Sequence, residues 1–288
     1  MDIEAISGAA AVALGCAILF LLIGRSWQAF VRNVGPGPRF SDSIMHEAAQ
    51  HLRDELQTLT SKQSTYLGGA MAFVLVFGVA YTFRAQELFS GYPRWQMYVL
   101  LALLVVAALL AAWRLVCTML ARGRVRLQHD ANVAVGHQLR LIAPGTSRVY
   151  HEVPTSAGIV DHVVVGTSGI YAVNVVARRP SSNGAVELAE NGLCFSPSGH
   201  TASIVELAAK SSRLGRELSN TLGHKIRVRS VLAVPGWQIE KQTDENHLLV
   251  NERTLGMIKG WRDSSDNLMN DDVAAIQADL TRRCSGRG

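Results

Sequence analysis

The 288-residue chain is long enough for one or two domains, and it carries a net charge of +5. Hydrophobic residues make up 48% and charged residues only 18%, against roughly 25% in a typical soluble domain. This composition argues against a chain that is soluble throughout, because almost all of the apolar excess lies before Leu120, in three separate blocks.

The three apolar blocks predict membrane-spanning helices. They cover about residues 5–23, 64–83 and 95–113, and none of them contains a charged residue. A bilayer core of about 30 Å needs about 20 apolar residues in a helix, and a charge inside it is costly. The first block follows Asp2 and Glu4 rather than a basic segment, so we interpret it as a retained span and not as a signal peptide.

Basic residues near the ends of the predicted spans set the orientation. Only Arg84 and Arg94 lie between the second and third spans. The basic residues of the other side are Arg25, Arg32, Arg39, Arg53, Lys62, Arg114, Arg122, Arg124 and Arg126. We therefore expect an integral protein of the plasma (cytoplasmic) membrane, with its N-terminus outside and its C-terminal domain in the cytoplasm.

A cytoplasmic amphipathic helix is expected at residues 43–62, after the Gly-Pro-Gly-Pro break at 35–38. Its apolar residues recur at helical spacing, which suits packing on the membrane or on the soluble domain. The alternative is a dimerisation helix, which would make the protein a homo-oligomer. Residues 1–126 thus form the predicted transmembrane region.

Residues 127–288 predict a cytoplasmic α/β domain with a mixed sheet. Two runs, at 159–165 and 170–176, are separated by a short Gly-containing turn and predict an antiparallel hairpin. Asn191-Gly192 is a favoured hairpin turn inside a weaker strand pair. Further strands are expected at 149–153, 226–234 and 248–250, and helices at 203–222, 252–261 and 271–282.

The hairpin sequence GIVDHVVVGTSGIYAVN, residues 158–174, resembles the core signature of the nuclease-related domain (NERD) family. That family has an Asp on the first strand and an E-x-K motif on the second. The resemblance extends over about residues 128–262, with Val135 to Leu139 in the position of the helix that opens the domain. It implies a restriction-endonuclease-like fold.

The active-site positions depart from the family pattern. Metal-dependent phosphodiester cleavage needs carboxylates to hold Mg²⁺, and Asp161 matches the first of them. The E-x-K positions read Asn174 and Val176, which lack the second negative charge and the lysine. Three further polar positions also differ, at Val160, at Asn132 and near His200 or Thr201. We therefore expect no catalysis, no bound metal and no cofactor.

Two alternatives stay open. A membrane-associated nuclease with a rearranged site would bind Mg²⁺ with a carboxylate from elsewhere, such as Glu152, Glu187 or Glu190. A purely structural membrane protein would use its domain to bind another protein. Asp161 itself is either a residual ligand contact or a solvent-facing strand residue paired with Arg178 or Arg179.

Basic residues supply candidate contacts to nucleic acid or lipid. Lys225, Arg227 and Arg229 alternate with apolar residues, as on one face of a strand, and Arg178 and Arg179 follow the hairpin. The alternative is a solvated surface. The leading expectation is a catalytically inactive, membrane-anchored NERD-like domain that binds or scaffolds, with lipid, nucleic acid or protein as its partner.

Overall fold

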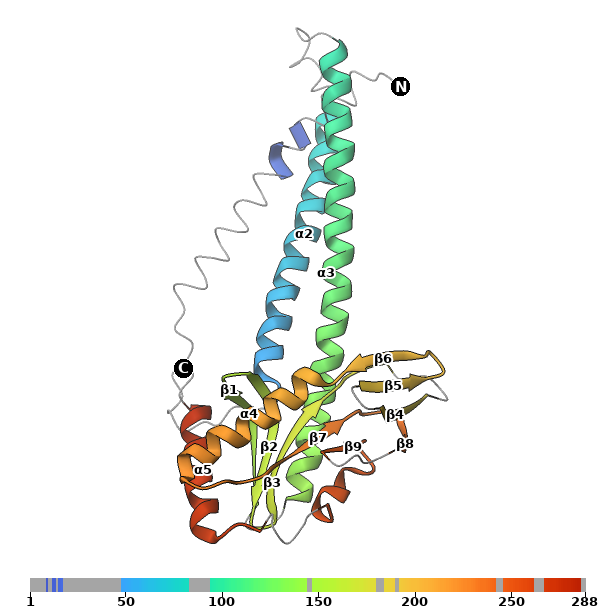
Figure 1. Ribbon diagram of the computed structural model, residues 1–288. Coiled ribbons are helices and arrows are strands. Elements are labelled where there is room, and N and C mark those ends of the chain that lie inside the picture. Colours follow the sequence, from blue (N-terminus) through green and yellow to red (C-terminus); the bar gives the residue numbers. More distant parts are fainter. Residues whose placement is uncertain are drawn as a thin grey trace. The chain divides into compact units, whose positions relative to one another are not determined.

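The computed structural model describes residues 9, 12–13, 15–17, 48–82, 94–143, 147–179, 184–189, 192–241, 246–261 and 267–285. The chain forms two units (Figure 1). One comprises residues 1–39 with 55–124, and the other comprises residues 40–54 with 125–288. Most of the first predicted span and the break at 35–38 lie outside the described residues, and the described residues of that span are helical.

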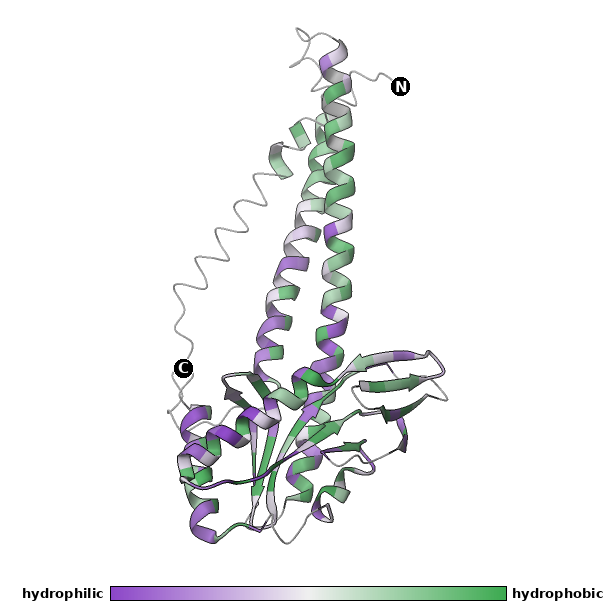
Figure 2. Ribbon diagram, viewed as in Figure 1, coloured by the Kyte–Doolittle hydropathy of each residue, from purple (hydrophilic) through white to green (hydrophobic). Residues whose placement is uncertain are grey.

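The first unit contains most of two long apolar helices, α2 (Gln50–Thr82) and α3 (Arg94–Ile142), whose residues 50–54 and 125–142 belong to the second unit. Both are long and apolar enough to cross a membrane, over Gln50–Ala80 and Val105–Ile142. Their large apolar side chains are widely exposed, as at Met71, Val74, Leu109 and Trp113, and Figure 2 shows these apolar stretches in green. The second and third predicted spans fall within these helices.

Helix α2 runs without interruption from Gln50. The segment predicted as a separate amphipathic helix therefore continues directly into the second apolar segment. The N-terminal part of the prediction, residues 43–47, lies outside the described residues. Arg122 Nη1 on α3 donates a hydrogen bond of 2.7 Å to Gln63 Oε1 on α2, within the first unit.

The second unit is built on a five-stranded mixed sheet in the order β1-β2-β3-β7-β9. The predicted hairpin is confirmed: β2 pairs antiparallel with β3, and Gly166 faces Gly169 at the turn, where Gly169 has φ +126°. Strands β7 and β9 run parallel to β3. The strand bounds are β1 Arg148–Thr155, β2 Gly158–Gly166, β3 Gly169–Val175, β7 Val228–Ala233 and β9 His247–Val250.

A second, four-stranded sheet has the order β6-β5-β4-β8. The predicted α/β domain with a mixed sheet is confirmed, but the domain has two sheets where one was expected, because β4 pairs in parallel with the distant β8; the smaller sheet packs around an apolar cluster that also includes Leu232 and Leu249 of the larger one. Phe195 and Trp237 meet edge to face in that core, at 4.8 Å between ring centroids. The bounds are β4 Ala185–Ala189, β5 Gly192–Ser196, β6 His200–Ser203 and β8 Gln238–Lys241.

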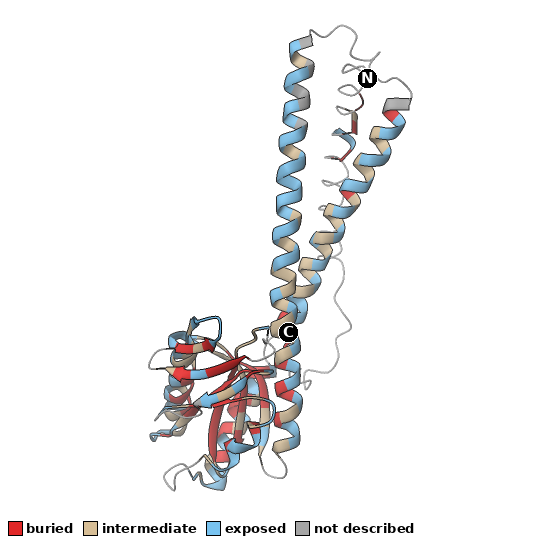
Figure 3. Cartoon of the chain, turned by 90° about the vertical axis from the view of Figure 1, so that its right-hand side faces the viewer, coloured by how far each residue is buried: buried red, intermediate tan, exposed pale blue. Residues whose placement is uncertain are grey.

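Helices cover both faces of the larger sheet, whose strands are mostly buried (Figure 3). On one face α4 (Val205–Leu222) and α5 (Asn270–Ser285) pack around residues such as Leu214 and Ile276. The other face packs against the C-terminal part of α3, through Val135 and Leu139, and against the 3₁₀ helix η2 (Leu255–Lys259). The predicted boundary at residue 126/127 thus falls inside α3.

The helix predicted at 252–261 is only the short η2. Asn251 Oδ1 accepts hydrogen bonds from the backbone N–H groups of Arg253 and Thr254, at 3.0 and 2.9 Å. A side chain that binds its own backbone in this way favours a turn over a regular helix.

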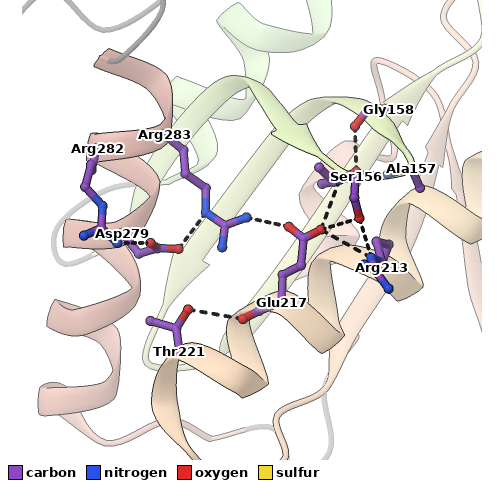
Figure 4. A network of polar contacts seen from close by, with 10 residues as sticks. Ser156, Ala157, Gly158, Arg213, Glu217, Thr221, Asp279, Arg282 and Arg283 are labelled. Atoms are coloured by element: carbon purple, nitrogen blue, oxygen red, sulfur yellow. Dashed lines mark hydrogen bonds and ion pairs between the residues drawn. The ribbon is translucent and has the colours of Figure 1, made fainter.

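A polar network ties α4, α5 and the β1–β2 turn together (Figure 4). Glu217 on α4 accepts hydrogen bonds from Ser156 N and Oγ, at 3.0 and 2.8 Å. Its other oxygen lies 2.6 Å from Arg283 Nη1 on α5, and Arg283 Nε lies 2.7 Å from Asp279. Arg213 Nε donates to Ser156 Oγ from the α4 side.

Candidate functional site around Asp161

Asp161 lies where the β1–β2 ladder is interrupted. The pairs His151–His162 and Val153–Val160 are formed, whereas the pair between them is not. Glu152, which stands opposite Asp161, has φ +54°, in the left-handed region that non-glycine residues rarely adopt. Backbone conformations of this kind often accompany functional sites, so the irregularity makes this point of the sheet a candidate functional site.

The Asp161 carboxylate is bound to the backbone of the neighbouring strand. Its Oδ2 accepts a hydrogen bond of 2.7 Å from the N–H of Val175 on β3. Burial raises the pKa of Asp161 to about 6, and the Val175 hydrogen bond and the Lys210 charge act in the opposite direction. Asp161 therefore uses one oxygen to hold β2 to β3, and no ion pair with Arg178 or Arg179 forms among the described residues.

The two positions that match E-x-K face the protein interior. Asn174 is completely buried, and its Nδ2 donates to Ser211 Oγ on α4 at 3.2 Å. Its Oδ1 has no hydrogen-bond partner among the described residues. Val176 packs against the apolar core of the smaller sheet, beside residues such as Val186 and Trp237. By the register of β2 and β3, Asn174 stands opposite Asp161, but its buried amide brings no negative charge, and Val176 offers no metal ligand.

Three glutamates were candidates for a rearranged metal site, and Glu152 is the one that lies near Asp161. Its negative charge contributes to the raised pKa of Asp161. Both Glu152 oxygens accept from the backbone N–H of His51, at 3.0 and 3.2 Å, and Oε1 also lies 2.6 Å from His51 Nδ1. His51 is in the first turn of α2, so the Glu152 carboxylate lies at a helix N-terminus, where the helix dipole stabilises a negative charge. Glu187 is exposed on β4, and Glu190 lies outside the described residues.

The local pattern of the sequence did not identify His51 and Lys210 as neighbours of Asp161. Both lower its pKa, and they reach it from α2 and α4 respectively. Lys210 thus supplies a positive charge near the carboxylate, although Val176 does not. In the described part of the chain, no group of three or more His, Cys, Asp or Glu side chains is arranged to hold a metal ion.

Beside this site lies a buried pair of histidines on the α3 side of the sheet. His151 Nδ1 and His162 Nδ1 are 2.8 Å apart, with the rings at 88°. Burial lowers the pKa of His151 to about 4 and that of His162 to about 3. Gly136 on α3 permits this packing, because a Cβ there would lie 2.9 Å from Ala48 Cβ and 3.3 Å from the His162 ring.

Of the three altered polar positions, Val160 directly precedes Asp161 on β2 and is fully buried, whereas the other two lie on other elements. Asn132 is buried on α3, and its Nδ2 donates to the carbonyl of Gln128 at 3.0 Å. Gln128 in turn binds Val175 O and Ala177 N, at 2.7 and 3.1 Å, and holds α3 to the end of β3. His200 and Thr201 are exposed on β6 of the smaller sheet.

Lys225, Arg227 and Arg229 do not line one strand face, so that expectation is wrong. Strand β7 begins only at Val228. Arg229 is buried, with its guanidinium 4.7 Å from the Trp261 ring centroid, whereas Lys225 and Arg227 are exposed beside α4. The two arginines after the hairpin also differ: Arg178 lies over the Phe195 ring at 4.9 Å, and Arg179 is exposed.

Comparison of the chain with protein-family models, with curated proteins and with solved structures finds no match.

Proposed function

We propose that this protein is a membrane-anchored NERD-like domain without nuclease activity, which acts as a binding or scaffolding module at the cytoplasmic face of a membrane. The observation that carries the proposal is the enclosure of Asn174 and Val176. One is fully buried beneath Ser211, and the other packs into an apolar core. The position from which the family's E-x-K motif would act on a substrate is therefore filled by protein.

The hydrogen bonds of the Asp161 and Glu152 carboxylates support the same conclusion. A catalytic carboxylate that binds Mg²⁺ must be ionised and must keep an oxygen free for the metal. With a pKa of about 6 Asp161 is ionised at neutral pH, but its Oδ2 is bound to Val175 N–H, which leaves one oxygen for a metal ion. Its nearest carboxylate neighbour, Glu152, uses both oxygens on the first turn of α2.

Membrane anchoring is supported by the exposed apolar surfaces of α2 and α3. Side chains such as Leu75, Leu110 and Trp113 are about two-thirds exposed, at 66, 61 and 67%. Exposed apolar area of this extent on long helices is stable only when lipid or another protein covers it.

The second candidate function is a metal-dependent nuclease with a rearranged site, and one observation favours it. Glu152 and Lys210 both act on the Asp161 carboxylate, so two carboxylates and an ammonium group are gathered there. This arrangement would become competent only if Glu152 were released from the N-terminus of α2.

A cleavage assay on the full-length protein in detergent separates the two candidates. Linear and structured DNA and RNA are incubated with Mg²⁺ or Mn²⁺, with the Asp161→Ala variant as the matched control. We expect the same background for both proteins. Metal-dependent cleavage that disappears in Asp161→Ala would establish the nuclease and refute the inactive module. Binding of the same nucleic acids, measured with and without Mg²⁺, then tests one class of partner directly.

A further inference from the structure

An open groove of about 940 Å³ lies beside α4, on the side of the domain that carries Lys225 and Arg227. Helix α4 forms one wall, and residues 224–228 and 267–269 complete it together with the first turn of α5. All of these segments belong to the second unit.

The groove is positively charged. Exposed side chains of Arg216, Lys225 and Arg227 line it. Among its described lining residues Asp272 is the one carboxylate, and its Oδ2 lies 3.6 Å from His224 Nε2. No carboxylate of the described residues forms an ion pair with Arg216 or Lys225.

Neutral hydrogen-bonding groups accompany these charges. Ser212 and Asn220 are exposed along the α4 wall and contribute to the lining, whereas the Ser219 hydroxyl is bound to Gly215 O and Ile226 N. Arginine and lysine together with serine and asparagine form the usual set of donors to phosphate oxygens. The groove therefore suits a ligand that presents phosphate.

The remaining lining residues distinguish a lipid phosphate from a nucleic-acid phosphate. No Phe, Tyr or Trp side chain is present among the described lining residues, and the one ring there, His224, lies 3.6 Å from Asp272, so the groove lacks a large stacking platform for single-stranded bases. Instead it carries Met269, which is 78% exposed, next to Leu268, which packs against the apolar core. An exposed apolar side chain beside basic residues is the arrangement found where proteins meet a lipid surface.

We propose that this groove binds the headgroup of an anionic phospholipid, with Arg216 and Lys225 on the phosphate and Met269 against the acyl chains. The inference rests in part on the proposed membrane anchoring. Apolar helices in the same chain would hold the domain close to the membrane, where the effective concentration of lipid headgroups is high. Phospholipid binding in the groove would then hold the domain against the membrane surface.

The test is a calorimetric titration of the full-length protein, in a neutral detergent at low salt, with dihexanoyl-phosphatidylglycerol. Dihexanoyl-phosphatidylcholine serves as the uncharged comparison. We expect saturable binding of the anionic lipid only. The Arg216→Gln/Lys225→Gln variant should weaken it roughly thirtyfold, because each basic residue near an anionic headgroup contributes about fivefold.

The matched control is Arg253→Gln/Lys259→Gln, which removes the same charge from two exposed positions outside the groove. It should leave the affinity nearly unchanged. If both double variants weaken binding equally, the affinity depends only on the net charge of the protein. If the two lipids bind with equal affinity, the protein has no site for the anionic headgroup. Either result overturns the proposal.

Met269→Gln tests the apolar part of the site. It should weaken dihexanoyl-phosphatidylglycerol several-fold and leave the binding of glycerol phosphate unchanged. If an oligonucleotide binds in place of the lipid, and the Arg216→Gln/Lys225→Gln variant loses it, the groove is a nucleic-acid site instead. The titration does not depend on nuclease activity or on membrane insertion, so its failure is distinct from a failure of the proposed function.

Discussion

Arg140 on α3 donates a hydrogen bond from Nε to Nε2 of His151 on β1, at 3.3 Å. An arginine has no acceptor, so Nε2 of His151 must be unprotonated and its Nδ1 must carry the hydrogen. His151 Nδ1 then donates to Nδ1 of His162, at 2.8 Å. The second histidine carries its own hydrogen on Nε2, which has no partner among the described residues.

Acid should therefore destabilise the domain through this pair. Burial lowers the pKa values of His151 and His162 below the ordinary 6.5, to about 4 and about 3, so the unfolded chain binds protons that the folded chain does not. Stability then falls as the pH drops from 6.5 towards 4, by on the order of 3 kcal/mol for each histidine. The His162→Gln variant should show a shallower fall in the free energy of unfolding, measured by denaturant unfolding across this range.

His200→Gln is the control for this series, since His200 is exposed on β6. It should retain the full pH dependence of the parent protein. A His162→Gln variant with an unchanged slope would show that the histidine pair is not the acid-sensitive element.

Replacing Asp161 by Asn should stabilise the folded state at neutral pH. The pKa of Asp161 is about 6 in the folded protein and 3.8 ordinarily, so folding favours the protonated carboxyl group. Its contribution to the stability of the folded state is complete below pH 3.8 and is lost as the pH rises through 6. The asparagine Oδ1 can still accept from Val175 N–H. We expect a gain of about 2 kcal/mol at pH 8 and almost none at pH 4.

Thermal unfolding of Asp161→Asn at both pH values checks this, with Asp130→Asn as the control, since the Asp130 side chain is 63% exposed. Addition of Mg²⁺ gives an independent check on the proposed inactivity. If Mg²⁺ stabilises the parent protein but not Asp161→Asn, the carboxylate is a metal ligand after all.

Glu217→Gln should loosen the contact of α4 with α5 and with the β1–β2 turn. Burial opposes the ionised form of Glu217, but hydrogen bonds from Ser156 and the Arg283 charge outweigh it and lower its pKa. Its contribution is therefore present above the ordinary pKa of 4.5 and is lost as the pH falls through the lower folded value. We expect a loss of about 1–2 kcal/mol at pH 7, measured by denaturant unfolding.

Arg282→Gln is the matched change in the same network, because Arg282 contacts Asp279 at 2.6 Å but its side chain is 79% exposed. An exposed ion pair contributes about 0–1 kcal/mol. Equal effects of the two variants would show that Glu217 does not join the three elements in the way described.

The topology of the membrane part has a direct test. Reporter fusions after Ser90 and after Gly288 should lie on opposite sides of the membrane, with Gly288 in the cytoplasm, because basic residues favour that side of the predicted spans. Alkaline phosphatase and green fluorescent protein fusions report the two sides. Finding both positions on the same side would contradict the three-span arrangement.

The sequence predicted those elements whose pairing is local. The β2–β3 hairpin needed only two apolar strands and the turn at Gly166 to Gly169. The division into two sheets was missed, because it depends on β4 pairing with β8 across about 50 residues of intervening chain. Strand and helix patterns carry no information about such pairings.

The candidate site shows the same limit. The hairpin sequence made Asp161 and Asn174 candidates, which stays a prediction, but their surroundings could not be predicted. Glu152 binds His51, which is 101 residues away in the sequence, and Lys210 approaches from a helix on another part of the chain. The interior position of Val176 also depends on the second sheet, which the sequence did not predict.

The continuity of α3 has a consequence for the order in which the domain is made. Its last turns bury Val135 and Leu139 against Val231, Leu248 and other residues of β7 and β9, which follow about 90–120 residues later. At a synthesis rate of about 10 residues per second, the β3 residues of the same cluster, Tyr171 and Val173, follow after about four seconds, and β7 and β9 only after roughly ten. The helix can therefore pack first on the β2–β3 hairpin, and its contacts with β7 and β9 complete the core later.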